Sequence, residues 1–133
     1  MVIKTVTYFE IPASDVERLK KFYSDCFGWR FEKVNMPGFE YWQISTGPES
    51  RSVGGGMYKK MGPNDGPKNY VSVDNIDSAI EIFRKAGGSE IVGKQEVPGR
   101  AWYIGADPEG NSIGFWQQMK AARRTTRRRK SKR

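Results

Sequence analysis

Hydrophobic residues recur at helical spacing in two segments, one in each half of the chain. The first segment carries Val16, Leu19, Phe22, Tyr23, Cys26 and Phe27, and the second carries Ile76, Ala79, Ile80, Phe83 and Ala86. This periodicity predicts two amphipathic helices. Ser14 and Glu17 favour a capping box at the start of the first helix. Gly28 and Gly88 follow the last apolar turns, where each is expected to form a left-handed C-cap.

Extended runs surround both predicted helices in the same order. The run "TVTYFEIP" precedes the first helix and "KNYVSVD" precedes the second. Three strands are expected after each helix, at residues 29–34, 39–46 and 52–58, and at 90–96, 100–106 and 112–117. The alignment that places Asp15 on Asn75 also pairs Trp42 with Trp102, whose symmetry fits matching core or dimer contacts. Each half therefore follows the order strand, helix, strand, strand, strand.

Two half-units of this kind need a common surface to bury their sheets. We therefore predict an α+β domain over residues 1–119, made of one module at about 1–60 and a second at about 66–119. The segment "KKMGPNDGPK" between them is rich in glycine and proline, so it is expected to be an exposed linker. A domain of this length is long enough to bury a core.

The duplicated pattern resembles the vicinal oxygen chelate superfamily, the group of glyoxalase I, bleomycin-resistance proteins and extradiol dioxygenases. Three segments carry the resemblance, "YFEIPASDVERLKKFYSDCFGW", "YVSVDNIDSAIEIFRKAGG" and "DPEGNSIGFWQ", and together they span about residues 3–118. The resemblance implies two curved four-stranded mixed sheets around a cavity. It also implies a homodimer in which the two modules form the site together.

Metal-using members of that superfamily hold the ion at four equivalent positions. The resemblance places a His or Gln in the first strand of each module, and a Glu in the last strand. This chain has Tyr8 and Lys68 at the opening positions and Gly54 and Gly114 at the closing positions. A neutral phenol is a poor ligand, an ammonium repels a cation, and glycine has no side chain. We therefore expect no bound metal and no other cofactor.

The composition narrows the possible chemistry further. The chain has no histidine and one cysteine. These counts exclude Ser-His-Asp and Cys-His catalysis, histidine metal sites and thiolate zinc sites. Cys26, on an apolar helix face, is interpreted as a small buried hydrophobe rather than a nucleophile. Carboxylates, lysines and tyrosines remain for chemistry.

Alternation along the strands assigns side chains to two faces. Phe9, Ile11, Val71, Val73, Ile113 and Phe115 are expected to face the helices. The opposite face gives the candidate ligand-binding residues, which are Tyr8, Glu10, Gly54, Lys68, Tyr70, Gly114 and Trp116. Glu10 and Lys68 form either an acid/base or ligand-orienting pair across the two modules, a structural ion pair, or two solvated rim charges.

The positive charge of the chain is concentrated at its C-terminal end. The whole chain has 23 basic and 15 acidic residues, and residues 120–133 hold nine of the basic residues and none of the acidic ones. The range 1–119 therefore carries 14 basic and 15 acidic side chains, a net charge of −1. Residues 120–133 are predicted to be a disordered basic tail. Weak, nonspecific association with nucleic acid or another polyanion would use Arg123, Arg124, Arg127, Arg128, Arg129 and Lys130.

The leading interpretation is a metal-independent protein that binds or sequesters a small molecule, so binding is favoured over catalysis. One alternative is a small-carbonyl isomerase or lyase that uses Glu10 or Lys68 as its catalytic residue. A second alternative is a polyanion-associated protein that acts through its tail. No apolar stretch approaches the roughly 20 residues of a membrane span, and the N-terminus lacks a signal-peptide pattern. A cytoplasmic location without membrane contact is expected.

Overall fold

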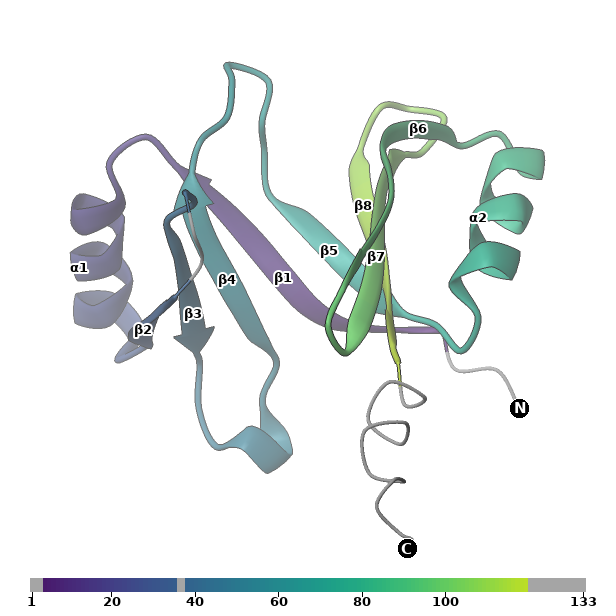
Figure 1. Cartoon of the computed structure of the whole chain (residues 1–133). Coiled ribbons are helices and arrows are strands. Elements are labelled where there is room, and N and C mark those ends of the chain that lie inside the picture. The colour runs from purple at the N-terminus through teal and green to yellow at the C-terminus, as the bar shows by residue number, and fades with distance from the viewer. Residues whose placement is uncertain (1–3, 36–37, 120–133) are drawn as a thin grey trace, which may run out of the picture. The chain divides into compact units, whose positions relative to one another are not determined.

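A computed structural model describes residues 4–35 and 38–119 of the chain (Figure 1). Its elements are β1 (Thr5–Ala13), α1 (Val16–Phe27), β2 (Arg30–Val34), β3 (Tyr41–Ser45), the 3-10 turn η1 (Glu49–Arg51), β4 (Gly54–Lys59), β5 (Lys68–Ser72), α2 (Ile76–Lys85), β6 (Ser89–Val97), β7 (Arg100–Ala106) and β8 (Ser112–Gln118). The predicted α+β class and the repeated β-α-β-β-β order are both confirmed. The expectation of two separate four-stranded sheets is wrong, because the eight strands of the described residues follow one another in a single mixed sheet.

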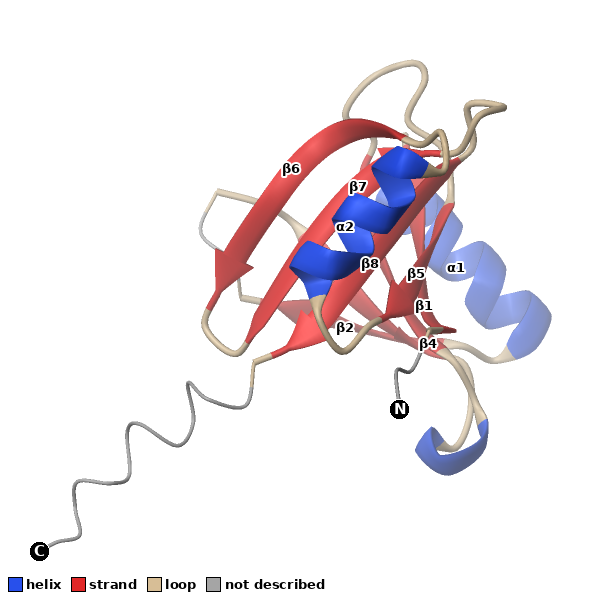
Figure 2. Cartoon of the chain, turned by 90° about the vertical axis from the view of Figure 1, so that its right-hand side faces the viewer, coloured by secondary structure: helices blue, strands red, loops and turns tan. Residues whose placement is uncertain are grey.

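The chain divides into two compact units. Residues 7–70 form the first unit, and the described residues on either side of this range belong to the second. In the first unit the strand order is β2-β3-β4-β1, with β1 parallel to β4 and the other neighbours antiparallel. The remaining strands follow in the order β5-β8-β7-β6, in which residues 68–70 of β5 still belong to the first unit, and β6, β7 and β8 are antiparallel. Helix α2 covers one face of these last strands (Figure 2).

The first unit packs α1 against one face of its sheet. The buried residues of this core are Ala13, Val16, Ile44 and Met57. Phe9 joins them from β1, and its ring lies so close to Gly55 that a Cβ there would overlap it. A glycine in this strand therefore admits an aromatic ring against the backbone.

The ends of α1 agree with the prediction in part. Gly28 has a φ of 73° and adopts the predicted left-handed C-cap conformation. The predicted capping box is wrong, because the N-cap is Asp15, whose carboxylate accepts a hydrogen bond from the Arg18 amide at 3.1 Å. Cys26 is exposed, and its prediction as a buried residue is wrong as well. The apolar stripe of α1 is wider than the sheet face that it covers, since Phe27 is also exposed.

The second unit packs α2 in the same manner. Its buried core contains Val73, Ile76, Ile80, Ala101, Tyr103 and Phe115. The helix begins at Asn75, whose side chain accepts a hydrogen bond from the Ser78 amide at 3.0 Å. The left-handed glycine after this helix is Gly87, with a φ of 111°, and not Gly88 as predicted. Gly88 has a different role, because the ring of Phe83 occupies the space where its Cβ would lie.

None of the helices in the described part of the chain is long and apolar enough to span a membrane.

Candidate functional site

Glu10 lies at the centre of a hydrogen-bonded group of tyrosines on the sheet face opposite α1. Its two carboxylate oxygens accept hydrogen bonds from the hydroxyl of Tyr41 at 2.8 Å and from the hydroxyl of Tyr70 at 2.9 Å. The hydroxyl of Tyr8 lies 2.8 Å from that of Tyr41. We call these four residues the Glu10–tyrosine network. All four belong to the first unit, residues 7–70.

The position of Tyr41 depends on a glycine in the neighbouring strand. Glu10 pairs with Gly56 across β1 and β4, and a Cβ on Gly56 would overlap the phenol of Tyr41. The bare backbone therefore lets the phenol lie across β4 and reach Glu10. The candidate residues named from sequence do not include Tyr41. Its place beside Trp42, which packs toward α1, is the signal that would have assigned it to the opposite face.

Burial governs the protonation of this network. Removal from water raises the pKa of Glu10, while hydrogen bonds from Tyr41 and Tyr70 and the charge of Lys68 oppose that rise. Burial also raises the pKa of Tyr41 and of Tyr70 far above the ordinary value for a phenol, and the nearby carboxylate adds to the rise. Both hydroxyls therefore keep their protons and donate to Glu10.

Lys68 belongs to a second polar group on the same unit. Its ammonium donates to the hydroxyl of Tyr58 at 2.5 Å, to Asp65 at 3.2 Å and to the carbonyl of Gly66 at 3.2 Å. The Tyr58 hydroxyl donates to Asp65 at 2.9 Å, and the Met61 amide donates to the other oxygen of that carboxylate at 3.0 Å. We call Tyr58, Asp65 and Lys68 the Lys68 cluster.

Two side chains of this cluster, Lys68 and Asp65, carry opposite charges and are mostly covered. The side chains of Lys68 and Asp65 are 6% and 15% exposed. Burial alone would raise the pKa of Asp65, but hydrogen bonds from the Met61 amide, Tyr58 and Lys68, with the lysine charge, lower it overall. Asp65 is therefore an ionised partner for the lysine.

Of the alternatives predicted for Glu10 and Lys68, a direct ion pair between the two is not observed. Within residues 4–35 and 38–119, no ion pair joins the two, and Lys68 pairs with Asp65. Asp65 comes from the predicted exposed linker, which turns back so that this carboxylate is largely covered. A sequence pattern of glycine and proline identified the turn but not the contact that one of its polar residues makes.

The four positions at which the resemblance expects metal ligands are occupied by other interactions or have no side chain. Tyr8 and Gly54 are register partners on β1 and β4, and the hydroxyl of Tyr8 is hydrogen-bonded to that of Tyr41. Lys68 is held by its own cluster. The described residues contain no group of three or more His, Cys, Asp or Glu side chains placed to hold a metal ion. This donor set does not fit the metal that the superfamily implies.

The remaining candidate residues lie outside the Glu10–tyrosine network. Gly114 and Trp116 are on β8 in the second unit, on the face opposite Phe115, as the alternation predicts. The guanidinium of Arg100 lies 5.3 Å from the centre of the Trp116 ring. Gly54, in the first unit, has space for a Cβ, whose nearest neighbour would be the Ile44 carbonyl at 3.4 Å. Residues 123–130, where the predicted polyanion-binding residues lie, are outside the described residues.

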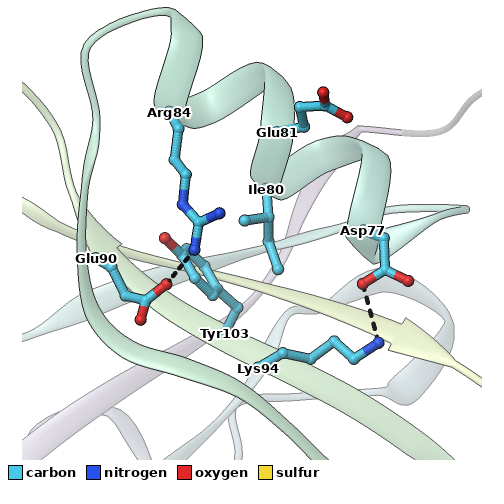
Figure 3. A pocket seen from close by; sticks show the side chains of 7 residues that line it. All are labelled: Asp77, Ile80, Glu81, Arg84, Glu90, Lys94 and Tyr103. Carbon is cyan, nitrogen blue, oxygen red and sulfur yellow. Dashed lines mark hydrogen bonds and ion pairs between the residues drawn. The ribbon is translucent and has the colours of Figure 1, made fainter.

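Two surface pockets lie away from the Glu10–tyrosine network. The larger, of about 420 Å³, lies between α2 and β6 (Figure 3). Arg84 pairs with Glu90 at 2.5 Å on one side of this pocket, and Lys94 pairs with Asp77 at 2.9 Å on the other. The second pocket, of about 300 Å³, lies beside Gly28 in the first unit. In the larger pocket, Arg84, Glu90, Lys94 and Asp77 pair with one another, whereas Glu81 pairs with Lys85, which does not line the pocket.

Comparisons with known proteins identify relatives over most of the chain. A family model described as the Glyoxalase/Bleomycin resistance protein/Dioxygenase superfamily matches residues 5–115. A glyoxylase-like domain-containing protein of Didymella fabae is 37% identical over 91 residues, which cover 65% of this chain and 70% of that protein. CFP32 of Mycobacterium bovis, whose name describes a candidate glyoxylase, is 24% identical over 119 residues. That match covers 85% of this chain but only 45% of CFP32.

A solved structure shares the fold at low sequence identity. Methylmalonyl-CoA epimerase from Mycobacterium tuberculosis superposes with a TM-score of 0.61 and 10% identity. The superposition covers 92% of this chain and 91% of the epimerase. At this identity the similarity concerns the fold and not the reaction.

Proposed function

Because the chain belongs to the Glyoxalase/Bleomycin resistance protein/Dioxygenase superfamily, we propose that it binds a small molecule at the Glu10–tyrosine network without a metal ion. The observation that carries this proposal is the pair of hydrogen bonds that a half-buried carboxylate accepts from Tyr41 and Tyr70. A strand interior has no structural need for such a group, since an apolar residue would fill the space without a desolvation cost.

The network has the composition of a ligand site. Tyrosine rings supply apolar contact area with few rotamers to freeze, and their hydroxyls supply directional hydrogen bonds. The rings of Tyr8 and Tyr70 meet edge to face, with centroids 6.0 Å apart. Tyr8, Glu10 and Tyr41 keep partial exposure, whereas Tyr70 is buried. A ligand can therefore reach the first three side chains, while the buried Tyr70 helps to hold Glu10 in position through its hydrogen bond.

Binding without a metal is supported by the residues at the expected ligand positions. Tyr8 and Lys68 are engaged with protein partners, and Gly54 and Gly114 have no side-chain donor atoms. In this proposal the ligand is recognised through contact with aromatic rings and through hydrogen bonds, and not through coordination to a metal ion.

A thermal-shift screen of small molecules tests the proposal. A ligand at 100 times its dissociation constant adds about 2.7 kcal/mol to the free energy of unfolding. We expect hits that shift the wild type and lose their effect in Tyr41→Phe, which removes one hydroxyl from the network. Any ligand that still shifts the melting temperature of Tyr41→Phe is tested on a variant whose basic tail residues are changed to Gln. If that shift is lost in the tail variant, the result would favour the polyanion alternative. The residues to change are Arg123, Arg124, Arg127, Arg128, Arg129 and Lys130.

A second candidate function, an isomerase or lyase acting on a small carbonyl compound, is favoured by the raised pKa of Glu10. A carboxyl whose pKa is raised in this way is suited to general acid–base catalysis. The catalytic interpretation predicts that Glu10→Gln abolishes turnover of a bound carbonyl compound while its affinity survives. The binding interpretation predicts that no product forms with either protein.

A further inference from the structure

The charges of the Glu10–tyrosine network and the Lys68 cluster do not cancel. Glu10 and Asp65 each carry one negative charge when ionised, and Lys68 carries one positive charge, so a net charge of −1 remains. The ammonium of Lys68 already donates hydrogen bonds to the Asp65 carboxylate, to the Tyr58 hydroxyl and to the Gly66 carbonyl, so its ion-pair partner is Asp65. Glu10 is left with two neutral phenols as its hydrogen-bonding partners.

A half-buried carboxylate whose hydrogen-bonding partners are neutral is costly to keep ionised. Its burial raises the pKa, and phenol donors offset only part of the lost hydration. A positive group beside the carboxylate would offset more, because Coulomb attraction is stronger away from bulk water. The network is therefore complementary to a cation that comes from outside the chain.

The aromatic residues around Glu10 add to this complementarity. Phe39 stacks on Tyr41 with ring centroids 6.1 Å apart, and Tyr8 meets Tyr70. Ring faces attract organic cations through their quadrupoles, and the attraction increases when water is excluded. The partly exposed members of the network are Tyr8, Glu10 and Tyr41, whereas the Lys68 cluster is mostly covered. The accessible end of the site is thus its negative, aromatic end.

We infer that the ligand of the Glu10–tyrosine network is a small organic cation, with an ammonium or guanidinium group that pairs with Glu10 and an apolar body that contacts the tyrosine rings. This inference rests on the proposed function, because it names the class of ligand for that same site. An organic anion at this place would meet the Glu10 carboxylate and would require its protonation.

Binding of the cation is linked to pH through Glu10. The groups that face it are Tyr41 from β3, Tyr58 from β4, Lys68 and Tyr70 from β5, and Asp65 from the preceding loop. The tyrosines stay protonated because their pKa values are raised, and Asp65 stays ionised because its pKa is lowered. Glu10 is the group that titrates, so affinity for a cation falls as the pH drops through its pKa.

Three probes of similar shape and different charge test the inference on the full chain. Benzylamine is a cation at neutral pH, benzyl alcohol is neutral, and benzoate is an anion. Each is titrated by NMR, with shifts followed at the residues of the network. We expect benzylamine to bind at least about tenfold more tightly than the other two, a difference of about 1.4 kcal/mol. We expect that preference to decrease at acidic pH.

Two variants and a matched control complete the test. Glu10→Gln should bring benzylamine to the affinity of benzyl alcohol and remove the pH dependence. Asp65→Asn, a second route if the first variant fails to fold, cancels the net negative charge and should reduce the preference in the same direction. Glu17→Gln removes one carboxylate from the exposed surface of α1 and should leave the preference unchanged.

The outcomes separate the inference from the proposed function. Equal or tighter binding of benzyl alcohol or benzoate at the network would overturn the charge inference and leave ligand binding at this site standing. Shifts confined to other regions, with none at the network for any probe, would overturn both. An undiminished benzylamine preference in Glu10→Gln would also overturn the inference.

Discussion

The two halves of the chain are alike on their helix-facing sides and different on their opposite faces. In the first half Phe9 lies over Gly55, and in the second half Phe83 lies over Gly105, so each core admits an aromatic ring by the same device. On the opposite faces, the first half presents the Glu10–tyrosine network. The second presents Trp102 and Trp116, which are register partners. The repeat therefore defines the scaffold, while the chemistry belongs to one half.

A one-residue difference in register contributes to this divergence. Ile44 pairs with Gly55 in the first half, whereas Ile104, its counterpart in the repeat, pairs with Gly114. Because side chains alternate between faces, a slip of one residue moves the whole strand pattern to the other side. The interpretation of Trp42 and Trp102 as matching core contacts is therefore wrong, while matching dimer contacts stay a prediction. Trp42 packs toward α1, and Trp102 lies on the face opposite α2.

The largest expected effect comes from the contrast between ion pairs in the two halves. Asp65→Ala leaves the buried ammonium of Lys68 without its carboxylate. We expect a loss of about 3 kcal/mol in the free energy of unfolding, near the lower end for a broken buried pair, since Tyr58 and Gly66 still accept from it. Urea denaturation measures this. Glu90→Ala, which removes an exposed pair with Arg84, is the control and should have almost no effect.

The next largest effect compares two glycines of the same strand. Gly56→Ala forces a methyl group into the phenol of Tyr41, and we expect a loss of about 1–3 kcal/mol in the free energy of unfolding. Gly54→Ala meets only the Ile44 carbonyl at an ordinary distance of 3.4 Å, so it should be nearly neutral. Equal losses for the two variants in urea denaturation would contradict the placement of Tyr41.

A smaller effect compares buried tyrosine hydroxyls. Tyr70→Phe removes a donor to Glu10 and should lower the free energy of unfolding by about 1.5 kcal/mol, the lower end of the range for hydrogen bonds to a charged group. Tyr103 in the second half is fully buried, and its hydroxyl makes no hydrogen bond of acceptable geometry to the described residues, although the guanidinium of Arg84 lies nearby. Tyr103→Phe should therefore leave thermal stability unchanged or raise it slightly. A large loss would show a partner for that hydroxyl.

The smallest expected effect is a change of stability with pH. Burial raises the pKa of Glu10 above its ordinary value of 4.5, so the folded chain binds this proton more tightly than the unfolded chain. The contribution is fully present below pH 4.5 and is lost as the pH rises through the folded-state pKa. Wild-type stability should therefore fall relative to Glu10→Gln over this range in urea titrations. A constant difference between the two proteins would argue against the raised pKa.

The sequence predicts the scaffold well because its signals are local. Helical spacing and strand alternation identified both helices, all eight strands and the faces of Phe9, Val73 and Phe115, since each pattern extends over only a few residues. The partners within the site depend on contacts between distant residues. Tyr41 reaches Glu10 across 31 positions, and its reach requires the absence of a side chain at Gly56. No local pattern encodes such a contact.

The ion-pair partner of Lys68 was also beyond prediction from the sequence. Lys68 has two candidate carboxylates, Glu10 on β1 and Asp65 in the preceding turn. The path of that turn brings Asp65 within 3.2 Å of the lysine. The charges of Glu10 and Lys68 were recognised in the sequence, but Asp65 was not named as a partner, because its contact with the lysine depends on the geometry of the turn.

The most direct test of the account is an NMR map of the first ligand that the thermal-shift screen identifies. Amide and tyrosine-ring shifts should cluster at Tyr8, Glu10, Tyr41 and Tyr70, and the cluster should disappear in Tyr41→Phe. Shifts centred on the pocket between α2 and β6, or on residues 120–133, with none at these four residues, would contradict the placement of the site in the first half.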